Sequence, residues 1–245
     1  MRPPLVLLHG WGLSPAVFTG LRQHLPRFSR IFTPWLPGHG AQEPAHGDEL
    51  ADWTEMLVPD LPDQAVLLGW SLGGMIALDL ARRHPRKVAR LVLVGTTPCF
   101  VTADDWPHGL GPDVVQGFRE GFASEPAGTL RRFVALQTLG DVRRKAVALA
   151  LSASLAPLDQ SDGGAPAEGL RLLAETDLRA EIGTIDLPTR VLHGRHDALM
   201  PAEAAVWLAD HLPQGRLTIF EDAAHAPFLS RPAEFATLID GFADE

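Results

Sequence analysis

The stretch LLGWSLGG, residues 67–74, places one serine between glycines directly after an apolar run. It matches G-x-S-x-G, a pattern in which a strand turns sharply into a helix and holds the serine hydroxyl exposed in a strained backbone conformation. Larger side chains two residues before and after the serine would collide, which explains the glycines at positions 69 and 73. Because an apolar run precedes the turn and a helical pattern follows it, we predict that Ser71 is a nucleophile.

The segments around this turn alternate between two patterns. Short apolar runs occur at residues 5–8, 65–69, 91–94, 190–192 and 216–220, and helical patterns at 14–25, 48–57, 72–84, 201–212 and 232–242. Most apolar runs are continuous rather than alternating, which is typical of strands that are buried on both faces of a parallel sheet. We therefore predict an α/β fold with a mostly parallel sheet, right-handed crossovers and flanking helices.

The middle of the chain departs from this alternation. Residues 99–186 contain helical patterns and no clear buried strand, and residues 161–166 have the composition of a loop. We interpret this region as a helical insertion that forms a lid over the carboxyl edge of the sheet. The predicted domain organisation is a core of residues 1–98 and 187–245, with residues 99–186 as the lid.

A serine nucleophile needs a base and an acid that orients the base. In this architecture the chain order is serine, acid, histidine, with the histidine near the C-terminus. His225 lies in a loop between the last strand and the last helix, among small neighbours, and is the predicted base. Asp197 follows the strand at 190–192 and is the predicted acid, because the segment after the strand at 91–94 offers no carboxylate before Asp104.

Other histidines fit these roles less well. His211 falls in a helical pattern, and His193 and His196 come too early in the chain. Together with Asp197 these last two could suggest a metal cluster, but the serine–histidine arrangement already accounts for Asp197. We therefore predict no metal and no organic cofactor.

The reaction of a serine with an ester carbonyl needs two N–H donors for the developing oxyanion. The first is expected from Leu72, directly after the nucleophile, at the amino end of a helix. The second is expected from Trp11 in the sequence HGWG, residues 9–12, which follows the first strand. Glycines there would let the backbone approach the oxyanion.

Composition limits the remaining possibilities. The 245 residues carry a net charge of −9, which argues against nonspecific binding of nucleic acid. The single cysteine, Cys99, excludes an internal disulfide, and no segment has the layout of a signal peptide or a membrane span. We expect a cytoplasmic protein and take a monomer as the working expectation.

With these features in order, the chain resembles the α/β-hydrolase superfamily. Within it, LVLLHGWGLSP (5–15), LGWSLGG (68–74), PCFVTADDWP (98–107), RFVALQTLG (132–140) and AAHAPFLSRPAEF (223–235) resemble the pimeloyl-acyl-carrier-protein methyl ester esterases of biotin synthesis. Members of that family hydrolyse a methyl ester on a carrier-bound acyl chain. The resemblance implies Ser71 as nucleophile, His225 as base, Asp197 as its orienting acid, and Trp11 and Leu72 as contacts of the carbonyl oxygen. It also implies an acyl channel lined by Phe133, Val134, Ala135, Leu136 and Gln137.

A local charge pattern bears on the partner. Residues 119–145 hold six basic and three acidic side chains in an otherwise acidic protein. Acyl carrier proteins are acidic, so a basic lid face could dock one and increase the association rate. The candidate docking residues are Arg131, Arg132, Arg143, Arg144 and Lys145; an ordinary solvated helix face is the alternative.

These observations together predict a serine carboxylic-ester hydrolase acting on the methyl ester of pimeloyl-acyl-carrier protein. A general short-chain carboxylesterase without carrier-protein specificity is the first alternative. A hydrolase-fold binding protein with little turnover is the second, although a pure binder has no need of Ser71, Asp197 and His225 together.

Overall fold

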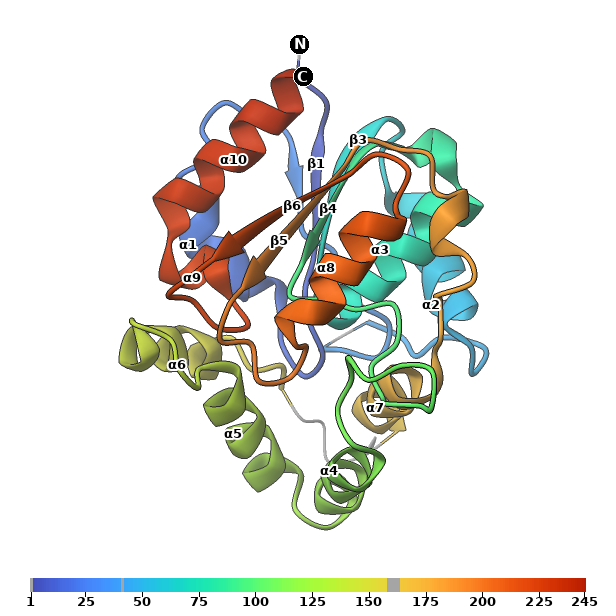
Figure 1. Cartoon of the computed structure of the whole chain (residues 1–245), viewed down its shortest axis with the longest axis vertical. Coiled ribbons are helices and arrows are strands. Elements are labelled where there is room, and N and C mark those ends of the chain that lie inside the picture. The colour runs from blue at the N-terminus through green and yellow to red at the C-terminus, as the bar shows by residue number, and fades with distance from the viewer. Residues whose placement is uncertain (1, 41, 158–163) are drawn as a thin grey trace.

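One six-stranded sheet forms the centre of the protein (Figure 1). The structure is a computed structural model that describes residues 2–40, 42–157 and 164–245. The strands are β1 (Leu5–Leu8), β2 (Ile31–Phe32), β3 (Ala65–Trp70), β4 (Val88–Val94), β5 (Thr189–Gly194) and β6 (Gly215–Phe220). Their order is β2-β1-β3-β4-β5-β6, and every neighbouring pair is parallel. This confirms the expected α/β class.

Helices cover both faces of the sheet (Figure 1). On one face lie α2 (Leu50–Leu57), α3 (Leu72–Arg83) and α8 (Ala202–His211); on the other lie α1 (Thr19–Arg22), α9 (Pro227–Ser230) and α10 (Pro232–Asp244). Short 3₁₀ segments span Pro15–Phe18, Val58–Asp60, Pro85–Lys87 and Ile182–Thr184. The strands are therefore enclosed on both sides.

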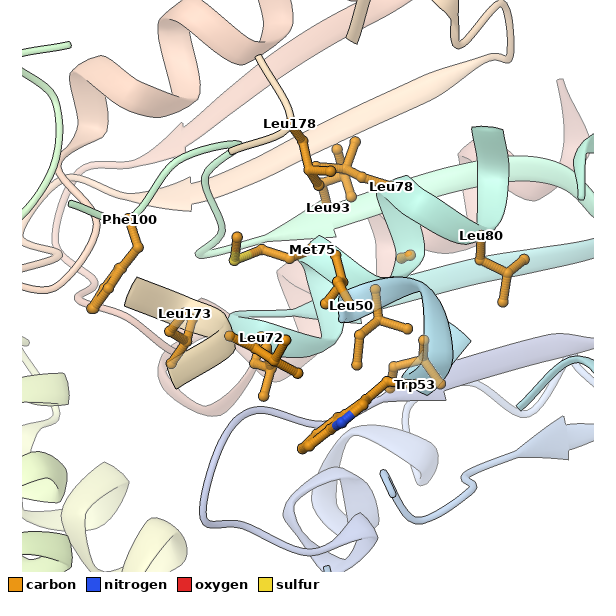
Figure 2. Packing of buried hydrophobic residues seen from close by; sticks show 14 of the residues in the cluster. Leu50, Trp53, Leu72, Met75, Leu78, Leu80, Leu93, Phe100, Leu173 and Leu178 are labelled. Carbon is orange, nitrogen blue, oxygen red and sulfur yellow. The ribbon is translucent and has the colours of Figure 1, made fainter. Parts of the chain in front are cut away.

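The two faces have separate hydrophobic clusters, and successive residues of β1 belong to different ones. Val6 and Leu8 pack in the cluster of α2 and α3, whereas Leu5 and Leu7 pack in the cluster of α1 and α10. Figure 2 shows the first cluster, in which Leu72 lies near Leu173 from the region between β4 and β5. Because each face is covered, every position of β1 is apolar, which explains the continuous run in the sequence.

The region between β4 and β5 begins with an irregular segment, residues 95–111, and continues with helices in the part that the structure describes. It contains α4 (Pro112–Ser124), α5 (Pro126–Gln137), α6 (Arg144–Ala153) and α7 (Gly164–Glu175). These helices lie beyond the carboxyl ends of the strands, at the bottom of Figure 1. Part of the expected loop, residues 161–163, lies outside the described residues; the rest was wrong, because residues 164–166 begin α7.

Two further expectations differ from the structure. The helix expected over residues 14–25 is a 3₁₀ segment followed by the single-turn α1, because its end tightens, with the N–H of Leu25 donating to the carbonyl of Arg22 at 3.2 Å. The two-residue edge strand β2 was missed, since a run of that length has no periodicity to detect.

Candidate active site

Ser71 occupies the turn between β3 and α3 with φ +58° and ψ −122°. A positive φ is costly for a residue with a side chain, so the surroundings must hold it. Its N–H donates to the carbonyl of Val94 at 3.0 Å, and its carbonyl accepts the hydroxyl of Thr96 at 2.8 Å. Both contacts come from β4 and its exit, so the neighbouring strand fixes the strained turn.

The two glycines of the turn allow close backbone approach. A Cβ on Gly69 would lie 2.3 Å from the carbonyl oxygen of Gly73. A Cβ on Gly73 would lie 2.5 Å from the carbonyl oxygens of both Leu8 and His9. Glycine is therefore required at both positions, and Gly73 sets the spacing between α3 and the loop after β1.

Asp197 and His225 come from loops that follow adjacent strands, β5 and β6. The Nδ1 atom of His225 lies 2.7 Å from Oδ2 of Asp197, and both side chains are fully buried. This contact assigns the proton to Nδ1 and leaves Nε2 as the acceptor nitrogen. In the described part of the chain, Nε2 is buried without a hydrogen-bond partner. The backbone of the histidine is held by Trp70, whose indole N–H donates to the His225 carbonyl at 2.9 Å.

The Asp197 carboxylate is held from both sides. Its Oδ1 atom accepts the N–H groups of Leu199 at 3.0 Å and Met200 at 2.9 Å. Burial raises the pKa of this carboxyl, but the neighbouring imidazoles of His225 and His193, the His225 hydrogen bond and the Met200 N–H together hold the pKa below its usual value. Asp197 is therefore a negatively charged, oriented partner for His225.

A second histidine, which sequence reasoning did not place in the site, lies against the same carboxylate. The Nε2 atom of His193 lies 2.7 Å from the carbonyl of Met200 and 3.4 Å from Oδ2 of Asp197. Burial lowers the pKa of His193, so the ring is neutral and donates from Nε2. The only signal in the sequence is its position at the end of β5.

The loop after β1, residues 9–12, lies beside Ser71. A Cβ on Gly10 would lie 3.1 Å from the Cβ of Ser71. Leu72 is the first residue of α3. Within residues 2–40, 42–157 and 164–245, neither the N–H of Trp11 nor that of Leu72 has a hydrogen-bond acceptor. Two free N–H groups therefore flank the serine.

Two buried histidines fix this loop to the segment after β2. His9 Nε2 accepts the N–H of Leu36 at 3.1 Å, and His39 Nε2 accepts the N–H of Gly12 at 3.1 Å. Burial and the neighbouring His39 lower the pKa of His9 to about 3, and burial lowers the pKa of His39 to about 4. Both rings are therefore neutral acceptors at neutral pH. The sequence contains no pattern that assigns this role to His39.

The Trp11 side chain joins the loop to the inserted helices. Its indole N–H donates to the carbonyl of Pro166 at 2.5 Å, and its ring packs edge-on against Phe122 and Phe133 with centroid distances of 5.4 and 4.9 Å. A cavity of about 230 Å³ between α4 and α7 is lined by Arg119, Phe122, Ala167, Glu168, Leu170 and Arg171. Phe122 both lines this cavity and contacts the ring of Trp11.

The five expected channel residues lie on α5 and do not share one face. Phe133 packs with the cluster that contains Trp11, whereas Val134 packs with the opposite cluster and Ala135 is exposed. Leu136 is partly buried beside the first cluster, and Gln137 is buried with both side-chain polar atoms unpaired among the described residues. A helix turns by about 100° per residue, so a continuous run of five cannot line one wall.

The candidate docking residues are all exposed on α5, on α6 and in the turn between them. They are Arg131, Arg132, Arg143, Arg144 and Lys145. Arg131 and Arg132 lie 3.4 and 3.7 Å from carboxylate oxygens of Glu125. The basic residues thus lie in the region between β4 and β5, and Arg143 also contacts α9, where its guanidinium donates to the carbonyl of Ser230 at 3.2 Å.

The described residues show no group of three or more histidine, cysteine or acidic side chains placed to hold a metal ion. The helices seen in these same ranges are too short or too polar for one to cross a membrane.

Comparison with known proteins gives consistent matches. A family model described as alpha/beta hydrolase fold matches residues 3–232. The chain is 57% identical over 244 residues to a pimeloyl-[acyl-carrier protein] methyl ester esterase of Aromatoleum aromaticum, covering 98% of this chain and 97% of that protein. It is 39% identical to the protein of the same name from Nitrosomonas europaea, covering 97% and 94%. An esterase structure from Exiguobacterium antarcticum superposes with a TM-score of 0.84 at 22% identity, covering 99% and 92%.

Proposed function

Because the chain belongs to the alpha/beta-hydrolase family, we propose that it is a serine carboxylic-ester hydrolase that cleaves the methyl ester of pimeloyl-acyl-carrier protein. The observation that carries the chemistry is the buried Asp197–His225 pair, 2.7 Å apart, in loops beside the strained turn of Ser71. The substrate comes from the names of the two relatives described above.

In the proposed mechanism, Ser71 Oγ attacks the ester carbonyl while His225 Nε2 takes its proton. The N–H groups of Leu72 and Trp11 stabilise the oxyanion of the tetrahedral intermediate. His225 then protonates the departing methoxide, which leaves as methanol, and Ser71 keeps the acyl group. Water attacks this acyl-enzyme with His225 again as base, and the free carboxylate leaves as Ser71 is restored. Asp197 keeps the Nδ1 proton in place throughout.

The acyl carrier protein is the proposed partner. Arg131, Arg132, Arg143, Arg144 and Lys145 give the insertion an exposed basic surface in a protein of net charge −9. An acidic carrier protein is attracted to such a surface, and this attraction acts mainly on the association rate. We further propose that the enzyme acts as a cytoplasmic monomer.

The test compares the carrier-bound methyl ester with a free short-chain ester, in wild type and in a variant with Arg131, Arg132, Arg144 and Lys145 changed to glutamine. The matched control changes Arg22, Arg27, Arg86 and Arg216, which are exposed on the core, to glutamine. We expect the insertion variant to lose at least tenfold in kcat/KM on the carrier-bound ester only, with a weaker salt dependence. The control should lose little on either ester.

Two other outcomes would favour one of the two alternative functions. Equal handling of both esters by wild type and variant would indicate the general carboxylesterase. A burst of product from an activated ester would exclude the binding protein, whereas no release of product at all, in a burst or in the steady state, would favour it.

A further inference from the structure

The loop that carries His225 is bound by a segment of the insertion. Residues 137–143, from the last residue of α5 to the residue before α6, form a turn that we call the brace turn. It contacts residues on both sides of His225, in the loop and short helix that follow β6. The base is therefore positioned by the insertion as well as by the sheet.

Backbone contacts make the first part of this attachment. The N–H of His225 donates to the carbonyl of Gln137 at 3.2 Å. The N–H of Val142 donates to the carbonyl of Asp222 at 3.0 Å. The brace turn is thus hydrogen-bonded to the loop at two places, at His225 and at Asp222 three residues before it.

The carboxylate of Asp141 makes the second part of this attachment. Asp141 Oδ2 accepts the N–H of Ala224 at 2.9 Å and the hydroxyl of Ser230, and Oδ1 accepts the N–H of Arg143 at 2.7 Å. Asp141 is only 6% exposed. A buried carboxylate is tolerated where donors surround it, and here the donors come from just before His225, from α9 and from the brace turn itself.

The brace turn also reaches the loop of the acid. Gly140 has φ +82°, and a Cβ there would lie 2.8 Å from the Cβ of His196, the neighbour of Asp197. Close packing at Gly140 therefore aligns the turn with the Asp197 loop while Asp141 holds the His225 loop.

We propose that Asp141 is a positioning residue that sets the place of His225 relative to Asp197 and Ser71. This rests on the proposed roles of those three residues in hydrolysis. Asp141 touches none of the reacting atoms; it acts through the N–H of Ala224, one residue before the base. Displacement of a base by about 1 Å can lower a rate roughly a hundredfold, so one lost contact here has a measurable effect.

The test uses Asp141→Asn, which replaces an acceptor oxygen by an NH₂ group facing donors. Its matched control is Asp79→Asn, which alters another buried carboxylate, 3% exposed on α3 and bound by Arg82 and Arg83. A fluorophosphonate that labels Ser71 reports both the labelled fraction and the rate constant of labelling. A p-nitrophenyl ester gives kcat and KM, and neither probe depends on a carrier protein.

We expect Asp141→Asn to lower kcat and the labelling rate constant at least tenfold, with KM within about twofold and one label per folded chain. Asp79→Asn should change neither rate constant by more than twofold, even if it lowers the melting temperature as much as Asp141→Asn does. Ser230→Ala removes one donor and keeps the carboxylate, so it provides a milder variant if Asp141→Asn folds poorly; we expect a two- to fivefold decrease in the labelling rate constant.

A wild-type labelling rate constant in both variants, with only the labelled fraction reduced, would overturn the proposal, because Asp141 would then act on folding alone. Failure of the wild type to be labelled at Ser71 is a different result. It would overturn the proposed hydrolase mechanism itself, on which the role of Asp141 rests.

Discussion

The imidazole of His39 accepts the backbone N–H of Gly12 at 3.1 Å, inside a fully buried site. Gly12 has φ +70° and follows Trp11, one of the two proposed oxyanion donors. A side chain 27 residues away in sequence therefore holds the loop that carries this proposed donor.

His39→Ala removes that acceptor and leaves the Gly12 N–H buried without a partner. Loss of an entire oxyanion donor lowers kcat about a hundred- to a thousandfold. Since Trp11 would be displaced rather than removed, we expect a smaller decrease, roughly ten- to a hundredfold, with KM little changed. Steady-state kinetics with a free ester measure this, and His24→Ala on the exposed surface is the control.

The same histidines predict how stability depends on pH. Their pKa values, about 3 for His9 and about 4 for His39, lie below the ordinary 6.5. The unfolded chain therefore binds protons below pH 6.5 that the native protein excludes, and the free energy of unfolding decreases as pH falls from 6.5 towards 4. The slope is about 1.4 kcal/mol per pH unit for each histidine. Urea unfolding at several pH values should show this, with a shallower slope in His39→Ala.

Ser71→Ala removes the proposed nucleophile and leaves the fold. We expect turnover to fall on the order of a millionfold, as when the serine of such a triad is lost. Unchanged circular dichroism would show that the turn still forms. Near-normal activity in this variant would contradict the mechanism.

Asp197→Asn keeps the shape of the side chain but removes the charge next to His225. The amide can donate to the histidine and so favour the tautomer with the proton on Nε2, which is unable to act as base. We expect kcat to fall by about ten-thousandfold. The labelling rate of Ser71 by a fluorophosphonate should fall in parallel, whereas retention of the wild-type rate would argue against Asp197 as the orienting acid.

Gly73→Ala places a Cβ 2.5 Å from the carbonyl oxygens of Leu8 and His9, where only backbone movement can relieve the clash. We expect a decrease of several degrees in melting temperature and loss of activity. Gly117→Ala is the matched control, because it lies in α4 with no atom within 4 Å of the added Cβ. There alanine should stabilise the helix by about 0.5–1 kcal/mol. Equal effects of the two substitutions would contradict this account of Gly73.

The fold and the order of the site residues could be predicted because they depend on neighbours in sequence. Continuous apolar runs marked five of the six strands, and the glycines beside Ser71 marked the strand-to-helix turn. Asp197 and His225 were predicted from the chain order serine, acid, histidine, and their loops emerge at one edge of the sheet because they follow adjacent parallel strands. The two side chains meet there at 2.7 Å.

Other contacts depend on how distant segments pack, and no local pattern encodes them. His39, in the segment after β2, accepts the N–H of Gly12, and Asp141 accepts the N–H of Ala224, 83 residues away, because the turn between α5 and α6 packs against the loop of His225. The assignment of Phe133 to one cluster and Val134 to the other likewise depends on what packs against each face of α5. Sequence alone determined which groups are available for hydrolysis. Tertiary structure decided what holds them, because a hydrogen bond between distant residues needs a relative position that only the packed fold defines.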